Sequence, residues 1–302
     1  MANLKEIRVR ISSVKSTRQI TSAMKMVSAS KLRKAQNAIL NLRPYAEKLA
    51  GLLNVLQRRV EGNAKGKIED ISAYSVSRPV KNALVVVFTA SKGLCGPYNS
   101  FVIKKTIQHI AEFEDDVNVK LFVIGKKGYE FLKKREWEII DTELNVLSGD
   151  TFNECMKIAE RLMGMFVEHE FDKIDVVYNK FKNPAVQEVI SEQFLPLQNQ
   201  DHDPDSYVNK MSQVDINDII LEPDEEEVLS ELIPKTIKTL FYKIVLDSFA
   251  SEQGARMTAM HKATDNASEV LKDLTIKYNK ARQAAITGEI VEIVSGAEAL
   301  NQ

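Results

Sequence analysis

Both ends of this 302-residue chain carry apolar residues in a heptad pattern, and that pattern limits the folds open to it. Alternating spacings of three and four residues mark the face of a helix that packs against a second helix. The N-terminal pattern spans about 55 residues, so its helix would extend roughly 80 Å. A compact domain of this size cannot enclose such a helix. The seam positions are Leu4, Ile7, Ile11, Val14, Leu32, Ala35, Ile39, Leu42, Ala46, Leu49, Leu53 and Leu56.

Polar residues occupy the seam between the two apolar runs of this N-terminal pattern, without a change of register. One interpretation is that a coiled coil tolerates a few polar seam residues. The other is that the helix contacts a different partner between residues 18 and 28, where Ile20, Met24 and Val27 place apolar groups on a neighbouring face. The polar seam residues are Arg18, Thr21, Lys25 and Ser28.

A second long helix is expected over residues 222–302, because acidic residues at 224–227 suit a helix N-terminus. Its roughly 75 helical residues would extend about 110 Å, some 30 Å more than the first helix. Two such helices leaving one central domain on the same side pair antiparallel and form a protruding rod. Pro44 and Pro234 predict kinks rather than helix ends. The C-terminal seam is Ala267, Leu271, Leu274, Tyr278, Ala281 and Ala285.

The longer helix would leave its last turns unpaired at the tip of the rod. This segment carries Ile290, Val291, Ile293 and Val294. Apolar groups on an unpaired helix end need a partner surface. We therefore expect these four side chains to form a tip bearing.

The centre of the chain predicts a Rossmann-like α/β domain with a mostly parallel sheet, since apolar strands alternate with helices that would cover both faces. Residues 60–223 hold 14 of the 20 Gly and Pro residues. The chain thus divides into an N-terminal helix (1–60), a central domain (75–215) and a C-terminal helix (222–302). The expected strands are 83–90, 117–124, 174–178 and an edge strand at 186–197; the expected helices are 98–115, 126–135 and 150–170; residues 199–221 form a connecting loop.

The formal net charge of −1 is the sum of very unequal parts. Residues 1–60 carry +11, residues 222–302 carry −5 and the remainder −7. A basic helix with heptads suggests a nucleic-acid-binding zipper, but here the seam begins at Leu4, ahead of most of the charge. No aromatic residue for base stacking precedes Tyr45. We expect no nucleic acid as partner, because a positive rod inside an acidic protein socket accounts for the same charges.

Cysteine usage and the N-terminus bear on the compartment. Cys95 and Cys155 form no CxxC pair, which favours a reducing compartment. The charged first residues lack an apolar core, so neither a signal peptide nor a transit peptide is expected. The longest apolar runs, such as 83–88, are far shorter than the ~20 residues that span a bilayer. These features predict a chain that is soluble or peripheral to a membrane.

The residues offer little catalytic chemistry. The turns Gly93–Gly96 and Gly125–Gly128 each follow a strand, but neither matches a phosphate-binding motif, so we expect tight structural turns. Cys95 is expected to be a structural thiol. The four histidines are scattered without metal-ligand spacing. No catalytic, cofactor-binding or metal residue is predicted, although a soluble α/β nucleotide-binding enzyme with a coiled-coil dimerisation arm remains an alternative.

Several segments resemble one protein family in order along the whole chain. They are residues 20–36 (ITSAMKMVSASKLRKAQ), 250–260 (ASEQGARMTAM), 263–267 (ATDNA) and 278–294 (YNKARQAAITGEIVEIV), together with the GLCG turn at 93–96. The chain is similar to the γ subunits, or central rotor shafts, of F-type ATP synthases.

This resemblance implies an antiparallel coiled coil seated in a ring of three α and three β subunits, with the central domain at the foot near the ε subunit and the membrane c-ring. Proton flow would turn the shaft and drive ATP synthesis, or ATP hydrolysis would drive pumping. ATP, ADP and Mg²⁺ would be bound by the ring, so this chain would be a non-catalytic subunit without a cofactor. With no transit peptide, the resemblance favours a bacterial chain, peripheral at the cytoplasmic face of the plasma (inner) membrane.

The resemblance also assigns coupling contacts. Met24 and Lys25 match positions where the shaft meets a moving β-subunit loop. Arg282 and Gln283 match positions that engage the β catch region, and Thr287 and Glu289 extend that surface. Three residues depart from the family pattern: Pro97 after the central turn, Gly254 in place of a usual alanine, and Gly288 where a longer polar residue is frequent.

Overall fold

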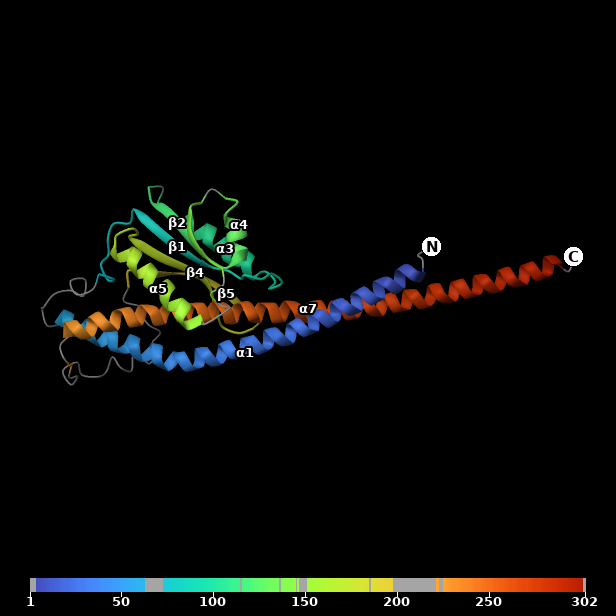
Figure 1. The fold of residues 1–302 in the computed structure, drawn as a ribbon, viewed down its shortest axis with the longest axis horizontal. Helices are drawn as coiled ribbons and strands as arrows, with labels where there is room; N and C mark the ends of the chain where they lie inside the picture. The colour runs from blue at the N-terminus through green and yellow to red at the C-terminus, as the bar shows by residue number, and fades with distance from the viewer. Residues whose placement is uncertain are drawn as a thin grey trace. The chain divides into compact units, whose positions relative to one another are not determined.

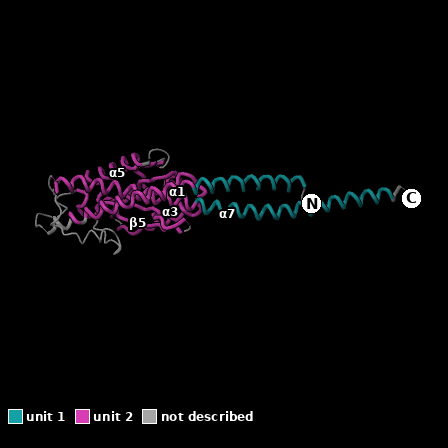
Figure 2. The backbone as a smooth tube through the Cα atoms, turned by 90° about the horizontal axis from the view of Figure 1, so that it is seen from below, with its two compact units in different colours: residues 1–29, 256–302 teal, residues 30–255 magenta. Residues whose placement is uncertain are grey.

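The computed structural model of the chain describes residues 4–62, 73–114, 116–135, 137–144, 146, 151–184, 186–197, 221–222 and 225–300. The chain forms two compact units, drawn in different colours in Figure 2. Residues 1–29 and 256–302 make the first unit, and residues 30–255 make the second. Two long helices contribute to both units: α1 (Leu4–Gly62) and α7 (Glu225–Leu300).

In the first unit, α1 and α7 lie side by side (Figure 2). Side-chain contacts between described residues join them, and the residue numbers rise along α1 as they fall along α7, so the helices are antiparallel. Every heptad position of α1 from residue 4 to residue 28 is buried or half-buried. The predicted antiparallel coiled coil is therefore confirmed. The contacts pair Arg8 with Tyr278, Thr21 with Thr264 and Lys25 with His261.

The two prolines lie inside the long helices and end neither of them. Pro44 is internal to α1, and Pro234 is internal to α7. Proline removes one backbone donor, yet the flanking seam residues still pack, so tertiary burial outweighs the local loss.

The second unit is built on a five-stranded sheet in the order β3-β2-β1-β4-β5. The first four strands in this order are parallel, and β5 runs antiparallel to β4 at one edge. The mostly parallel sheet and its edge strand agree with the prediction. The elements are β1 (Asn82–Phe88), α3 (Tyr98–Ile110), β2 (Asn118–Ile124), α4 (Lys126–Leu132), β3 (Ile139–Glu143), α5 (Thr151–Val167), β4 (Lys173–Phe181) and β5 (Gln187–Leu195).

Successive residues of the central strands pack on opposite faces of the sheet, as the period of two requires. Leu84, Val86 and Phe88 of β1 join a core with α5, α7 and the second-unit part of α1. Val85 and Val87 join a separate core with α3 and α4. Figure 1 shows these two helices beside the sheet. Helices thus cover both faces, which makes the central strands apolar throughout.

The sequence pattern misses one strand, β3, whose residues are IIDTE. All five are half-buried, because β3 lies at the outer edge of the sheet. An edge strand needs no continuous apolar run. The predicted connecting loop at 199–221 lies outside the described residues except for Leu221. The boundaries 1–60, 75–215 and 222–302 stay predictions.

An acidic side chain is buried on α7 in the second unit. Asp247 is 6% exposed, and burial raises its pKa from 3.8 to about 6. Lys243, Lys180 and Arg43 oppose this rise, while Glu192 adds to it. The folded chain therefore binds this proton more readily than the unfolded chain, so the ionised carboxylate costs stability above pH 6.

The substitution Asp247→Asn should stabilise the protein at neutral pH, because it removes the buried charge. We expect the free energy of unfolding to rise by about 1 to 3 kcal/mol at pH 7.5. The difference from the unsubstituted chain should shrink as the pH falls through 6 towards 4, where the folded carboxyl is already neutral. Urea denaturation of both chains at the two pH values measures this difference. Equal stabilisation at both, or destabilisation at pH 7.5, contradicts the assignment.

Candidate coupling surface on the paired helices

The polar seam residues of α1 meet polar residues of α7. The hydroxyl oxygens of Thr21 and Thr264 lie 2.9 Å apart, and Nζ of Lys25 lies 3.3 Å from Nδ1 of His261. Thr21 is only 9% exposed and Ser28 only 2%. The seam therefore continues through residues 18–28 in the same register. A coiled coil that tolerates polar seam residues is the interpretation that the structure supports for these positions.

The neighbouring face of α1 remains exposed in the same segment. Ile20 is 60% exposed and Val27 is 56% exposed, whereas Met24 is half-buried. These apolar groups lie outside the seam, so pairing with α7 leaves them accessible to another protein. This segment thus has two features. Its polar seam is accounted for by pairing with α7, whereas its exposed apolar face is not covered by the described part of the chain.

The predicted contacts near the C-terminus are all exposed on α7. Arg282, Gln283, Thr287 and Glu289 fall on successive turns, so Gln283 lies beside Thr287 and Arg282 shares a face with Glu289. Oγ1 of Thr287 donates to the backbone carbonyl of Gln283 over 2.9 Å. Arg282, Gln283 and Glu289 are therefore exposed on a regular helix, whereas the hydroxyl of Thr287 bonds to that helix.

The unpaired end of α7 begins where α1 begins. Nη2 of Arg8 donates to the Tyr278 hydroxyl over 2.8 Å, and this is near the last level at which the two helices touch. Ala281 is half-buried, but Ala285, predicted as the next seam position, is exposed because the described part of α1 does not reach it. The predicted seam is wrong at that residue.

Beyond this level, the predicted tip residues point into solvent within the described chain. Ile290, Val291 and Val294 are 55–57% exposed, and Ile293 is 70% exposed. Glu289 and Glu292 are also exposed, and residues 283–297 contain no Lys or Arg. The end of α7 is therefore an apolar and mildly acidic surface.

The structure places the predicted coupling residues at two levels and does not bring them together. Lys25 lies opposite His261, and Arg282 follows 21 residues later on α7. At the helical rise this separation is about 32 Å. The two sets could therefore contact two different parts of a surrounding partner.

The crevice in which an α/β sheet of this type binds nucleotides is occupied by α7. The switch point of the sheet lies between β1 and β4. There the Tyr98 hydroxyl lies 2.7 Å from Oγ of Ser248, and Ser251 donates to the backbone carbonyl of Asn179 over 3.2 Å. Burial raises the pKa of Tyr98, which keeps its hydroxyl neutral. The alternative of a nucleotide-binding enzyme is not favoured, since the chain fills this crevice itself.

The turns that follow β1 and β2 are structural, as predicted. Cys95 in the first turn is 1% exposed, and its sulfur accepts a hydrogen bond from Nδ2 of Asn99. In the second turn, Gly125 adopts φ 101°, and a Cβ there would lie 1.9 Å from the carbonyl oxygen of Thr89. The amide of Gly128 donates to Oγ1 of Thr89, so it is not free for a phosphate.

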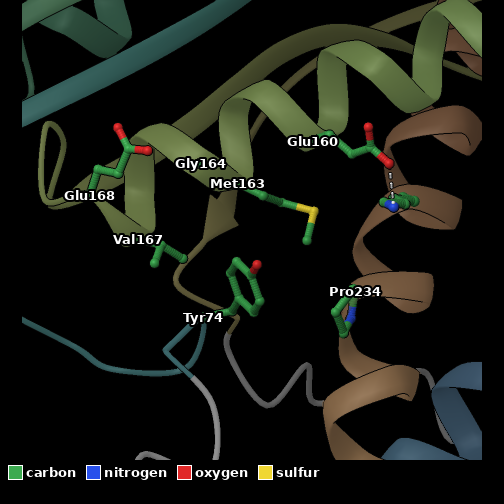
Figure 3. Close-up of a pocket in the computed structure, with 8 residues that line it drawn as sticks. Tyr74, Glu160, Met163, Gly164, Val167, Glu168 and Pro234 are labelled. Carbon is green, nitrogen blue, oxygen red and sulfur yellow. Dashed lines mark hydrogen bonds and ion pairs between the residues drawn. The ribbon is translucent and has the colours of Figure 1, made fainter.

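A hollow of about 320 Å³ lies in the second unit between α5 and α7 (Figure 3). Met163, Val167 and Pro234 line it with apolar atoms, and Lys238 at its rim donates to Glu160 over 2.6 Å. Tyr74 and Glu168 also line the hollow, and Lys238 and Glu160 are paired with each other. Elsewhere in the described chain, no group of three or more His, Cys, Asp or Glu residues is arranged to hold a metal ion. No described helix combines the length and apolar character needed to cross a membrane.

Comparison with known proteins agrees with the sequence resemblance. A family model described as ATP synthase matches residues 3–300. The ATP synthase gamma chain of Flavobacterium psychrophilum is 52% identical over 300 residues, which cover 99% of both chains. That of Flavobacterium johnsoniae is 51% identical over 301 residues, with full coverage of both. The chain belongs to the ATP synthase gamma-chain family.

Solved structures show the same fold at lower identity. A chain of the Euglena gracilis mitochondrial ATP synthase matches with a TM-score of 0.64 at 17% identity, covering 98% of this chain and 94% of its own. A chain from the central stalk and c-ring of the Tetrahymena thermophila mitochondrial ATP synthase gives 0.57 at 23% identity, covering 81% and 99%. The paired helices and the central sheet are thus a shared architecture.

Two glycines at which this gamma-chain family member departs from the pattern have different surroundings. A Cβ at Gly254 would lie 3.2 Å from Cα of Pro184 in the β4–β5 connection, so glycine allows a close approach there. A Cβ at Gly288 would meet nothing within 4 Å. Only Gly254 is explained by packing.

Alanine at these two positions should therefore have different effects. Gly288→Ala should stabilise α7 locally by about 1 kcal/mol through helix propensity. Gly254→Ala gains the same propensity but must displace Pro184, so we expect no net gain. Amide hydrogen exchange around each residue measures both effects, and each variant serves as the control for the other. Equal added protection at the two sites contradicts the packing role of Gly254.

Proposed function

We propose that this chain is the central shaft of a proton-translocating F-type ATP synthase, which rotates inside the ring of α and β subunits. The observation that carries the proposal is the unpaired end of α7, where Ile290, Val291, Ile293 and Val294 are exposed. An exposed apolar helix end is costly in water and calls for an enclosing surface. Membership of the gamma-chain family supports the ring as that surface.

The tip is suited to act as a bearing. Apolar contact is non-directional, so burying Ile293 and its neighbours in an apolar sleeve stabilises every angle of the shaft similarly. The free energy of the tip contact then has no deep minimum at any one rotation angle. This contrasts with hydrogen bonds and ion pairs, which depend on orientation.

The coupling contacts are suited to respond to the rotation angle of the shaft in the ring. Arg282, Gln283, Thr287 and Glu289 lie exposed on turns of α7 below the tip. The half-buried Met24 and Lys25 lie on α1, and the level of Lys25 is about 32 Å from that of Arg282. Exposed polar contacts are worth about 0.2 to 1 kcal/mol each, so they can be exchanged from one ring subunit to the next. Together they convert the angle of an asymmetric shaft into different states of the β subunits.

The remaining parts follow from this role. One copy of the chain serves three α and three β subunits, and the central domain contacts the ε subunit and the c-ring at the foot. ATP, ADP and Mg²⁺ bind to the ring, so the chain is a non-catalytic subunit without a cofactor of its own. Proton flow through the c-ring turns it at the cytoplasmic face of a bacterial inner membrane.

Co-expression of the chain with α and β subunits tests this function. We expect a stable complex that contains one copy of the chain for three of each partner, because the apolar tip is buried only in the ring. Mass measurement of the intact complex gives the stoichiometry. Recovery of a free, monodisperse chain that ignores both partners would overturn the proposal.

The double substitution Arg282→Ala and Gln283→Ala should weaken coupling without unfolding the helix, since alanine is the best helix former. We expect ATP hydrolysis by the assembled complex to continue while ATP-driven proton pumping falls several-fold, as loss of about 1 kcal/mol at a contact implies. Pumping into inverted vesicles measures the effect.

A matched control removes one cation and one amide from the paired part of α7, by Lys272→Ala and Asn279→Ala. Both residues are exposed, and this variant should pump normally. Unchanged pumping in the Arg282 and Gln283 variant, or an equal loss in the control, refutes the assignment of the two coupling residues.

A further inference from the structure

Lys25 is the one charged residue of α1 between Arg18 and Lys31, and its side chain turns towards α7. Its Nζ lies 3.3 Å from Nδ1 of His261. An ammonium group can only donate hydrogen bonds. Nδ1 must therefore accept in this contact, which requires that it carry no proton.

The same ring nitrogen has a second neighbour with the opposite requirement. Oδ2 of Asp265, one turn further along α7, lies 3.4 Å from Nδ1 of His261. A carboxylate can only accept hydrogen bonds, so a bond to Asp265 needs a proton on Nδ1. One nitrogen cannot accept from Lys25 and donate to Asp265 at the same time.

We propose that His261 positions Lys25 and releases it when Nδ1 gains a proton. The protonated ring donates to Asp265 and repels the ammonium group of Lys25, which is then free to bind an acidic group of a partner protein. Histidine is the side chain whose charge ordinarily changes between pH 5 and 8. The consequence for coupling rests on the proposed function, in which Lys25 touches the ring, whereas the exchange itself does not.

Few other charges face this cluster. On α7, Lys262 is adjacent to His261, and Arg256 lies more than one turn away; on α1, Arg18 and Lys31 lie about two turns from Lys25. The side chains of His261 and Asp265 are 56% and 65% exposed. Solvent therefore screens the contacts. We expect protonation of His261 to change the ratio of released to His261-bound Lys25 by about two- to fivefold.

Trace acetylation of the full-length chain tests the exchange without the ring. The labelling of Lys25 is measured by mass spectrometry relative to Lys15, an exposed lysine of the same helix, so that the general effect of pH on amines cancels. In the unsubstituted chain, we expect the Lys25 to Lys15 ratio to rise about two- to fivefold between pH 8.0 and pH 5.5, since the released amine is more accessible.

Two variants distinguish positioning by His261 from a general pH effect. His261→Gln keeps a neutral acceptor at every pH, so the ratio should stay low and constant. His261→Ala has no acceptor, so it should stay high and constant. A ratio that does not change in the unsubstituted chain, or that changes equally in either variant, overturns the proposal.

The assembled complex separates this inference from the proposed function. If Lys25 couples shaft and ring, His261→Gln should flatten part of the pH profile of ATP-driven pumping while the complex still assembles. If the chain shows the pH-dependent labelling of Lys25 and yet forms no complex with α and β subunits, the positioning role of His261 stands and the shaft function is refuted.

Discussion

Antiparallel pairing of α1 and α7 is the interaction on which the rest of the first unit depends. Apolar seam residues outside the polar segment, such as the half-buried Ile11 of α1 and the buried Leu274 of α7, hold the helices together. A polar layer brings Thr21 to Thr264 and Lys25 to His261. The buried Thr21 loses water but gains a partner, whereas His261 stays exposed. Such a layer stabilises the pair less than Leu would, yet it disfavours alternative alignments in which a buried hydroxyl would face an apolar residue.

The same helix serves a different purpose in the second unit. Residues 229–245 of α7 bury Leu229, Ile233, Ile237 and Phe241 against one face of the sheet. A few residues later, Ser248 and Ser251 replace these with small polar groups that bond to Tyr98 and to the backbone of β4. This places a helix where a nucleotide would bind in a related sheet. A Rossmann-like fold therefore needs no nucleotide function, because function depends on what fills the switch point.

Sequence patterns predicted the regular elements well, because they follow from local periodicity. The seam of α1 was correct at every described position, including the polar ones, and the strands ending at Phe88 and Ile124 were displaced by at most two residues. The strand β3 was missed because Asp141, Thr142 and Glu143 interrupt its apolar character at an edge of the sheet. Ala285 was wrongly placed in the seam because periodicity cannot say where the partner helix stops. Arg282, Gln283, Thr287 and Glu289 came only from resemblance to a family, whereas Met24 and Lys25 also fall in the segment 18–28 where the seam turns polar.

By itself, the sequence determined that two long helices flank an α/β domain, that the first is strongly basic, and that the second ends in exposed apolar residues. Each of these depends on residues close together in the chain, whose spacing and charge act locally. Only the tertiary structure decided that Lys25 reaches His261, 236 residues away, and that Tyr98 reaches Ser248, 150 residues away. Such pairs depend on the register of packed elements, which follows from burial summed over both partners and leaves no mark at either residue alone.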